Sequence, residues 1–143
     1  MNNQLIIKKT EDSPAVIMDA EKGYVCISGI SWPEDALSFY NPLHDWIREY
    51  FNNPQKITNI EFKFAYFNTA SAKQIAKFIT TIKESMKDNK IAVKWFYEKE
   101  DSEMLKTGKR YANILNIDFE FIETERQDED DNNSAEGVYK IQK

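Results

Sequence analysis

Residues 57–87, ITNIEFKFAYFNTASAKQIAKFITTIKESMK, contain the clearest change of pattern in the chain. Up to Phe67, apolar and polar residues alternate, which predicts a half-buried β-strand. One side of this strand carries Ile60, Phe62, Phe64 and Tyr66. After Asn68 and Thr69, the apolar residues are spaced three or four apart up to about residue 87, which predicts an amphipathic helix. A strand that leads directly into a helix is typical of α/β folds.

The same reasoning predicts the elements on either side of this segment. They are a hairpin of strands at 15–20 and 24–30, a helix at 37–51, a strand at 91–97, a helix opening at 101 and a last strand at 117–122. Pro42 leaves open whether the first helix begins only near Asn41, which could then cap it.

Strands that alternate with helices imply right-handed crossovers and parallel pairing. We therefore predict an α/β fold with a mixed, mostly parallel sheet of about five strands, three main helices and an opening β-hairpin. This order of elements is similar to that of the STAS-like domains of anti-sigma-factor antagonists. At 143 residues the chain has the length of one domain. We expect an N-terminal extension at 1–12, the domain at 13–123, and an acidic, disordered C-terminal tail at 124–143.

Composition and charge exclude several classes of function. The net charge of −5 argues against nonspecific binding to nucleic acid or to an anionic membrane, both of which need clustered Lys and Arg. The first residues lack the apolar run of a signal peptide, and no stretch approaches the ~20 apolar residues that span a bilayer. We therefore expect a cytoplasmic protein without a membrane or nucleic-acid partner.

Residues that could support catalysis are sparse. His44 is the only histidine and Cys26 the only cysteine, so neither a multi-cysteine nor a histidine-rich metal site is expected. His44 lies in an aromatic helical pattern and Cys26 in the middle of a strand, where structural roles are commoner than catalytic ones. The glycine-rich phosphate-binding motifs are absent. We expect no enzyme, no cofactor, no metal and no small-molecule substrate.

The strand-to-helix junction at Thr69 allows two interpretations. The hydroxyl of Thr69 could cap the helix, or Asn68 could do so with Thr69 one position inside. Alternatively, Thr69 could carry a regulatory phosphate, which the positive end of the helix and Lys73, one turn on, would stabilise. Such a phosphate adds roughly −2 charge at pH 7 and would repel a partner that docks against an uncharged hydroxyl.

Several segments in a fixed order add a family resemblance. They are SPAV at 13–16, GISWPEDA at 29–36, FYNPL at 39–43, Trp46, YFNTASAK at 66–73 and VKWFY at 93–97. Over about residues 13–123 the chain resembles the SiaC-type regulatory phosphoproteins, a bacterial family with a STAS-like fold. Members of this family are switched by phosphorylation of the Thr in an Asn-Thr-Ser-Ser motif, which matches Thr69. Ala70 stands where the family usually has Ser, so Ser71 is the secondary candidate acceptor.

The resemblance implies a set of protein partners. They are a cognate Ser/Thr kinase, a PP2C-like phosphatase and an effector that is a diguanylate cyclase in the best-understood branch, which links the family to cyclic-di-GMP and biofilm control. We expect the partner-binding surface to consist of Asn68, Thr69, Ala70, Ser71, Lys73, Trp32, Pro33 and Glu34. The turn formed by Trp32, Pro33 and Glu34 could instead only shield the edge of the sheet.

Two other functions remain open from the sequence. The first is a constitutive STAS-like scaffold or dimerising adaptor in which Thr69 is only a helix cap. The second is a small-molecule-binding or catalytic domain, which would need a convergent polar pocket at the edge of the sheet.

Overall fold

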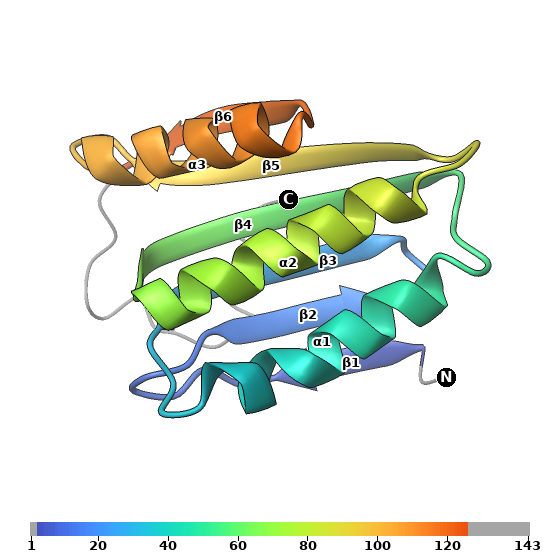
Figure 1. Ribbon diagram of the computed structural model, residues 1–143, viewed down its shortest axis with the longest axis horizontal. Coiled ribbons are helices and arrows are strands. Elements are labelled where there is room, and N and C mark those ends of the chain that lie inside the picture. The colour runs from blue at the N-terminus through green and yellow to red at the C-terminus, as the bar shows by residue number, and fades with distance from the viewer. Residues whose placement is uncertain (1–2, 126–143) are drawn as a thin grey trace.

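Six strands and three helices follow one another along residues 3–125, the part of the chain that the computed structural model describes (Figure 1). The strands are β1 (Gln4–Ile7), β2 (Ala15–Asp19), β3 (Tyr24–Ser31), β4 (Ile57–Phe67), β5 (Lys90–Glu98) and β6 (Phe119–Thr124). The helices are α1 (Ala36–Tyr50), α2 (Thr69–Ser85) and α3 (Ser102–Leu115). Of the predicted acidic tail, all but Thr124 and Glu125 lies outside the described residues.

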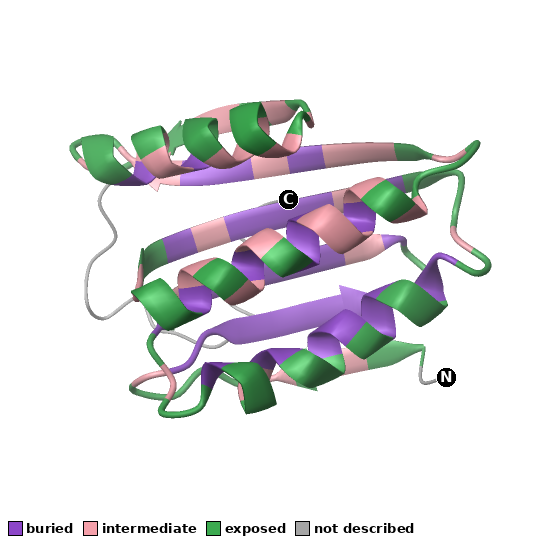
Figure 2. Ribbon diagram, viewed as in Figure 1, coloured by how far each residue is buried: buried purple, intermediate pink, exposed green. Residues whose placement is uncertain are grey.

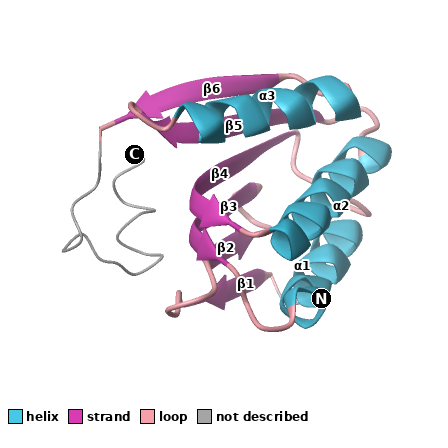
Figure 3. Ribbon diagram, turned by 60° about the vertical axis from the view of Figure 1, so that its left-hand side comes forward, coloured by secondary structure: helices cyan, strands magenta, loops and turns pink. Residues whose placement is uncertain are grey.

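The strands form one sheet in the order of the chain, from β1 at one edge to β6 at the other. β1, β2 and β3 pair antiparallel, and β3, β4, β5 and β6 pair parallel. Successive right-handed crossovers in one direction put their helices on one face, and Figure 3 shows all three helices on the same side of the sheet. The predicted α/β fold, with its mostly parallel sheet, three helices and opening hairpin, is confirmed. The STAS-like description remains a prediction.

The number of strands differs from the prediction of about five, because β1 lies in the segment expected to be an N-terminal extension. Four residues are too few to show an alternating pattern. In the structure they pair with β2, Ile7 opposite Val16, and the side-chain amide of Gln4 donates to Asp19 at 3.0 Å. Part of the expected extension is therefore an edge strand of the sheet.

The core lies between the sheet and the helices, and the inner surfaces of both are buried (Figure 2). Trp95, at the centre of β5, is fully buried, and its indole N–H donates to the carbonyl oxygen of Met104 at 3.0 Å. Trp46 on α1 is also buried. Gly108 lets α3 approach Trp95, because a Cβ at this position would lie 2.5 Å from the indole ring.

α1 begins earlier than Pro42 suggested. The carboxylate of Asp35 accepts from the backbone N–H of Ser38 at 3.1 Å and caps a helix that starts at Ala36. This hydrogen bond and the one from the Ser38 hydroxyl lower the pKa of Asp35. Asn41 therefore does not cap the helix. Pro42 lies inside it, where the ring cannot donate to the carbonyl oxygen of Ser38.

A bulge near the end of β4 changes which side chains face the core. Gly29 on β3 pairs with Phe64, but the next residue, Ile30, pairs with Tyr66, so Ala65 is passed over. The expected alternation is therefore wrong beyond Phe64. Tyr66 is 48% exposed, whereas Phe67 packs against the core. After the bulge, Tyr66 and Phe67 end the strand and lead to the junction with α2.

Candidate regulatory site

Asn68 caps α2, and Thr69 is the first residue of the helix. The side-chain oxygen of Asn68 accepts from the backbone N–H of Ser71 at 2.9 Å. Of the two capping arrangements that the sequence allowed, the structure has the one with Thr69 inside. The first turn of a helix has N–H groups without intrahelical acceptors, and within residues 3–125 those of Thr69 and Ala70 have no acceptor. An anion at this end of α2 would meet two free donors and the positive end of the helix dipole.

A buried set of hydrogen bonds fixes the junction to the rest of the fold. The backbone N–H of Asn68 donates to the carbonyl oxygen of Ser31, the last residue of β3, at 3.0 Å. The Ser31 hydroxyl lies 2.8 Å from those of both Tyr40 on α1 and Ser71 on α2. Burial raises the pKa of Tyr40, so its phenol stays protonated and can donate in this set. The position of Thr69 is thus held by β3 and α1 as well as by its own helix.

The predicted site residues differ in accessibility. Thr69, Ala70 and Lys73 are exposed, and Asn68 is partly exposed. Ser71 is 0% exposed, with its hydroxyl bonded to Ser31. A kinase or a docked partner cannot reach a side chain in this position without opening the helix. The geometry therefore disfavours Ser71 as secondary acceptor and as partner contact, and it leaves Thr69 as the accessible hydroxyl at the junction.

Trp32 lies at the same end of the parallel strands as this junction, directly after Ser31. Its ring is 46% exposed and packs edge-on against Tyr66, with 5.4 Å between the ring centroids. Its backbone N–H donates to the carbonyl oxygen of Asp12 at 2.8 Å. Pro33 is partly buried and Glu34 is exposed. The fold therefore brings both halves of the predicted partner surface to the C-terminal ends of the neighbouring strands β3 and β4, where the hydrogen bond between Ser31 and Asn68 links them.

A groove between α2 and α3 extends the site beyond the residues that the sequence identified. It has a volume of about 410 Å³. Its lining includes Phe67, Asn68, Thr69, Ala72, Lys73 and Ala76 on one side, and Thr107, Arg110, Tyr111, Ile114 and Leu115 on the other. The α3 residues were missed because no local pattern brings α3 beside α2. Only the order of the strands does so.

Tyr111 joins the two sides of this groove. Its hydroxyl donates to the carbonyl oxygen of Ala72 in the first turn of α2, at 2.7 Å. Burial raises the pKa of Tyr111 to about 12, although Arg110 beside it acts in the opposite direction. The phenol therefore remains a neutral donor at physiological pH, and it holds α3 against the start of α2.

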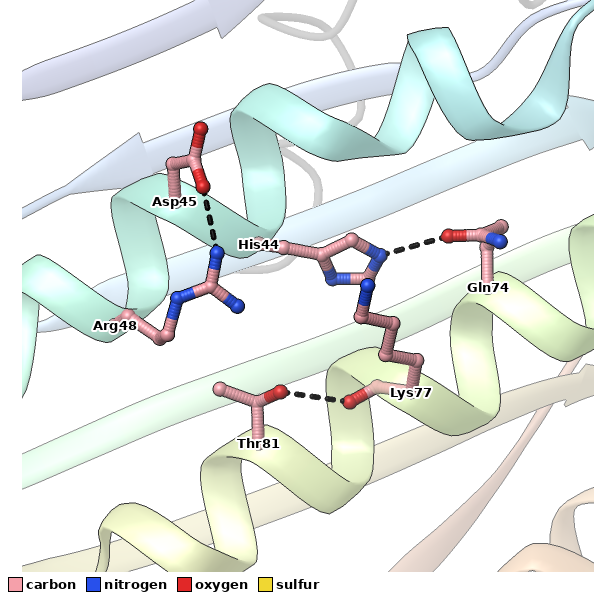
Figure 4. Close-up of polar contacts among 6 residues, drawn as sticks. All are labelled: His44, Asp45, Arg48, Gln74, Lys77 and Thr81. Carbon is pink, nitrogen blue, oxygen red and sulfur yellow. Dashed lines mark hydrogen bonds and ion pairs between the residues drawn. The ribbon is translucent and has the colours of Figure 1, made fainter.

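His44 has the structural position that the sequence favoured. It is 1% exposed, between α1 and α2, and its Nε2 lies 2.9 Å from the side-chain oxygen of Gln74 (Figure 4). Its Nδ1 has no hydrogen-bond partner within the described chain. Burial lowers the pKa of His44, and the nearby charges of Lys77 and Arg48 lower it further. The ring is therefore neutral at pH 7, and no carboxylate among the described residues hydrogen-bonds to it.

Cys26 lies inside the sheet, in β3. Cys26 is 2% exposed, and burial raises the pKa of its thiol to about 11, so it is a weak nucleophile. The described residues include no group of three or more His, Cys, Asp or Glu that could hold a metal ion. None of the described helices is long and apolar enough to cross a membrane.

The chain is similar to proteins of known family. A family model described as SiaC family regulatory phosphoprotein matches residues 7–124. An uncharacterized protein of Pseudomonas aeruginosa strain UCBPP-PA14 is 20% identical over 118 residues, which are 82% of this chain and 94% of that protein.

Solved structures have the same fold. SiaC of Pseudomonas aeruginosa superposes with a TM-score of 0.75 at 20% identity, over 88% of this chain and 100% of that one. A second match has a TM-score of 0.78 at 19% identity and covers 84% of this chain and 99% of that one. It comes from the crystal structure of the diguanylate cyclase SiaD in complex with its activator SiaC, also from Pseudomonas aeruginosa.

Proposed function

Because the chain belongs to the SiaC family of regulatory phosphoproteins, we propose that it is a protein-binding switch controlled by reversible phosphorylation of Thr69. SiaC of Pseudomonas aeruginosa is the activator of a cyclase that it binds, and the chain is a regulatory protein rather than an enzyme. The observation that carries the assignment to Thr69 is its position. It is exposed at the first turn of α2, while the neighbouring Ser71 is buried.

The surroundings of Thr69 suit a phosphate. The free N–H groups of the first turn and the helix dipole favour an anion there. Lys73 and Arg110 line the same groove as Thr69 and would add positive charge. A phosphothreonine carries roughly −2 charge at pH 7 and three strong acceptor oxygens, so it would change the surface without requiring a new fold.

We propose that a cognate Ser/Thr kinase and a PP2C-like phosphatase add and remove this phosphate, and that the effector is a diguanylate cyclase. The support for the effector is that SiaC of Pseudomonas aeruginosa is the activator of the cyclase SiaD and has the same fold as this chain. The unphosphorylated form would bind the cyclase, so the switch would act in cyclic-di-GMP signalling and biofilm control. The proposed kinase and cyclase use nucleoside triphosphates, and we therefore propose a cytoplasmic location.

The alternative of a constitutive scaffold or adaptor loses part of its basis. In that interpretation Thr69 serves only as a helix cap, but Asn68 is the cap and Thr69 lies inside the helix. An exposed threonine with no capping function is free to be modified without loss of the helix.

The test compares binding of the cognate cyclase to the full chain and to two variants at Thr69. We expect Thr69→Ala to bind as the unphosphorylated protein does. We expect Thr69→Glu to bind at least ~10-fold more weakly, because its carboxylate would place a negative charge in the interface with the cyclase. Thr81→Glu, further along the same helix, is the control. Equal binding by Thr69→Glu and Thr81→Glu would show that Thr69 does not control the interaction.

A further inference from the structure

The outer face of the sheet, opposite the helices, is buried, although all three helices lie on the other side (Figure 3). On β2, Ala15 and Ile17 form a buried cluster with Tyr24 that is separate from the main core. On β3 and β5, Cys26 and Phe96 are 2% and 7% exposed. A sheet face that meets water carries exposed residues in alternation with buried ones, whereas every residue of β2 is buried. The outer face therefore requires a further layer, which none of the described helices or strands supplies.

Glu61 and Lys63 complete the outer face as a buried ion pair. Their side chains are 9% and 8% exposed, and the Nζ of Lys63 lies 3.2 Å from Oε1 of Glu61. This Nζ also lies 4.9 Å from the centroid of the Phe96 ring. An ammonium group has three donors, but the Nζ of Lys63 has no hydrogen-bond partner within the described chain. Because a buried donor without an acceptor is costly, the layer over this face should bring an acceptor to Lys63.

We propose that this layer is the chain's own C-terminal segment, residues 126–143, which docks on the outer face. The segment contains both kinds of residue that the face needs. Its acidic run, residues 128–131, would supply carboxylate acceptors to Lys63. Its apolar residues Val138, Tyr139 and Ile141 would pack against the apolar side chains of β2 and β3. The composition of the segment predicts disorder in isolation, and the outer face would supply the partner that orders it.

The segment is long enough to make both contacts. Phe96 pairs with Ile122, so Lys63 lies two strand spacings, about 10 Å, across the sheet from β6. Four extended residues span about 13 Å, which is enough to bring Asp128 from the end of β6 to Lys63. The residues from Thr124 to Tyr139 span up to about 50 Å when extended, whereas β6 and β2 are only about 19 Å apart. The acidic run therefore reaches β4, and the apolar residues reach β2 and β3.

This inference goes beyond the function proposed for Thr69 and does not depend on it. Thr69 begins α2, on the opposite side of the sheet (Figure 3). The family match ends at residue 124, so the docked segment would be an addition to the fold that the family shares. By covering apolar residues of the outer face, the segment would keep a second copy of the chain from associating through them.

Cys26 is the only cysteine of the chain, so its thiol reports whether the outer face is covered. The full chain is treated with N-ethylmaleimide under native conditions, and the labelled fraction is followed by mass spectrometry. We expect Tyr139→Asp/Ile141→Asp to react on the order of tenfold faster than the wild type, because charges at these positions would release the segment. Asn133→Asp/Ser134→Asp adds the same charge to the polar part of the segment and should react as the wild type does.

A second measurement locates the segment directly. A carbodiimide joins a carboxylate to an amine that is in contact with it, and peptide mapping by mass spectrometry identifies the linked residues. In the full chain we expect a link between Lys63 and the acidic run, with a lower yield in Tyr139→Asp/Ile141→Asp. Lys56, exposed just before the start of β4, is the control and should not be linked to the run.

Three results would overturn the proposal. Equal labelling of Cys26 in the wild type and in Tyr139→Asp/Ile141→Asp would show that the segment does not cover the outer face. Links from the acidic run to Lys56 as often as to Lys63 would show that the run has no fixed position on the sheet. Links between Lys63 and the run that occur only in a dimer would show that a second copy of the chain supplies the layer.

Discussion

The hydroxyl groups of Ser31 and Ser71 lie 2.8 Å apart in the interior, although the two residues are 40 positions apart in the chain. This contact joins the end of β3 to the first turn of α2. It also explains why Thr69 and Ser71, which are close in sequence, differ so much in accessibility. Ser71 is part of the core, and Thr69 is on the surface. The candidate site is therefore an exposed hydroxyl group, that of Thr69, on a helix start that buried hydrogen bonds hold in place.

Asn68 should matter for the stability of the site more than for its chemistry. Asn68→Ala removes the side-chain oxygen that accepts from the N–H of Ser71. We expect a loss of about 1 kcal/mol in the free energy of unfolding, measured by chemical denaturation. Asn113→Ala, at an exposed position inside α3, is the control and should change stability by less than about 0.5 kcal/mol. Equal stability of Asn68→Ala and the wild type would contradict the capping role.

Gly108 should not tolerate even a methyl group. The Cβ of Gly108→Ala would lie 2.5 Å from the ring of Trp95, which is fully buried and bonded to Met104. We expect a loss of about 1–3 kcal/mol, because α3 must move away from the sheet. Alanine usually stabilises a helix relative to glycine, so the expected sign is opposite to that of helix propensity. Denaturation that shows Gly108→Ala to be as stable as the wild type would refute the close packing.

His44 should make stability depend on pH. Burial, with the charges of Lys77 and Arg48, lowers its pKa in the folded state below the 6.5 of an ordinary histidine. The unfolded chain therefore binds a proton more readily than the folded chain does. The contribution to stability is complete above pH 6.5 and is lost as the pH falls from there through the lowered pKa.

Replacing His44 by a residue that does not titrate should remove this part of the pH dependence. We expect the wild type to lose more stability than His44→Gln when unfolding is compared at about pH 7.5 and about pH 5.5. Glu84→Gln, at an exposed position on α2 that is not among the groups that shift the pKa of His44, leaves the histidine in place and serves as the control. A pH dependence that is the same in wild type and His44→Gln would show that another group is responsible.

Local patterns in the sequence were sufficient for most of the fold. The alternation in β4 and the spacing of Ile75, Phe78, Ile79 and Ile82 in α2 come directly from which side of each element is buried. The junction between them could be located for the same reason. That Asn68, and not Thr69, is the cap depends on one side-chain hydrogen bond, which both residues could form in principle.

The features that were missed depend on contacts between distant segments. β1 is too short to show a period, and it is a strand only because β2 offers it an edge. The bulge at Ala65 comes from the pairing of β4 with β3, and it reverses the side on which Tyr66 lies. The groove requires α3 to lie beside α2, which follows from the strand order and from the contact of Tyr111 with Ala72. The burial of Ser71 likewise depends on Ser31, a residue in another strand.

The most direct test of a switch at Thr69 is to locate the phosphate in the protein isolated from its own bacterial cells. Tandem mass spectrometry of the peptide that contains Thr69, Ala70 and Ser71 distinguishes the two hydroxyl residues. We predict a phosphate on Thr69, none on Ser71, and no phosphorylated form of the chain in cells that carry Thr69→Ala. A phosphate on Ser71 or on a distant residue, with Thr69 unmodified, would contradict the assignment.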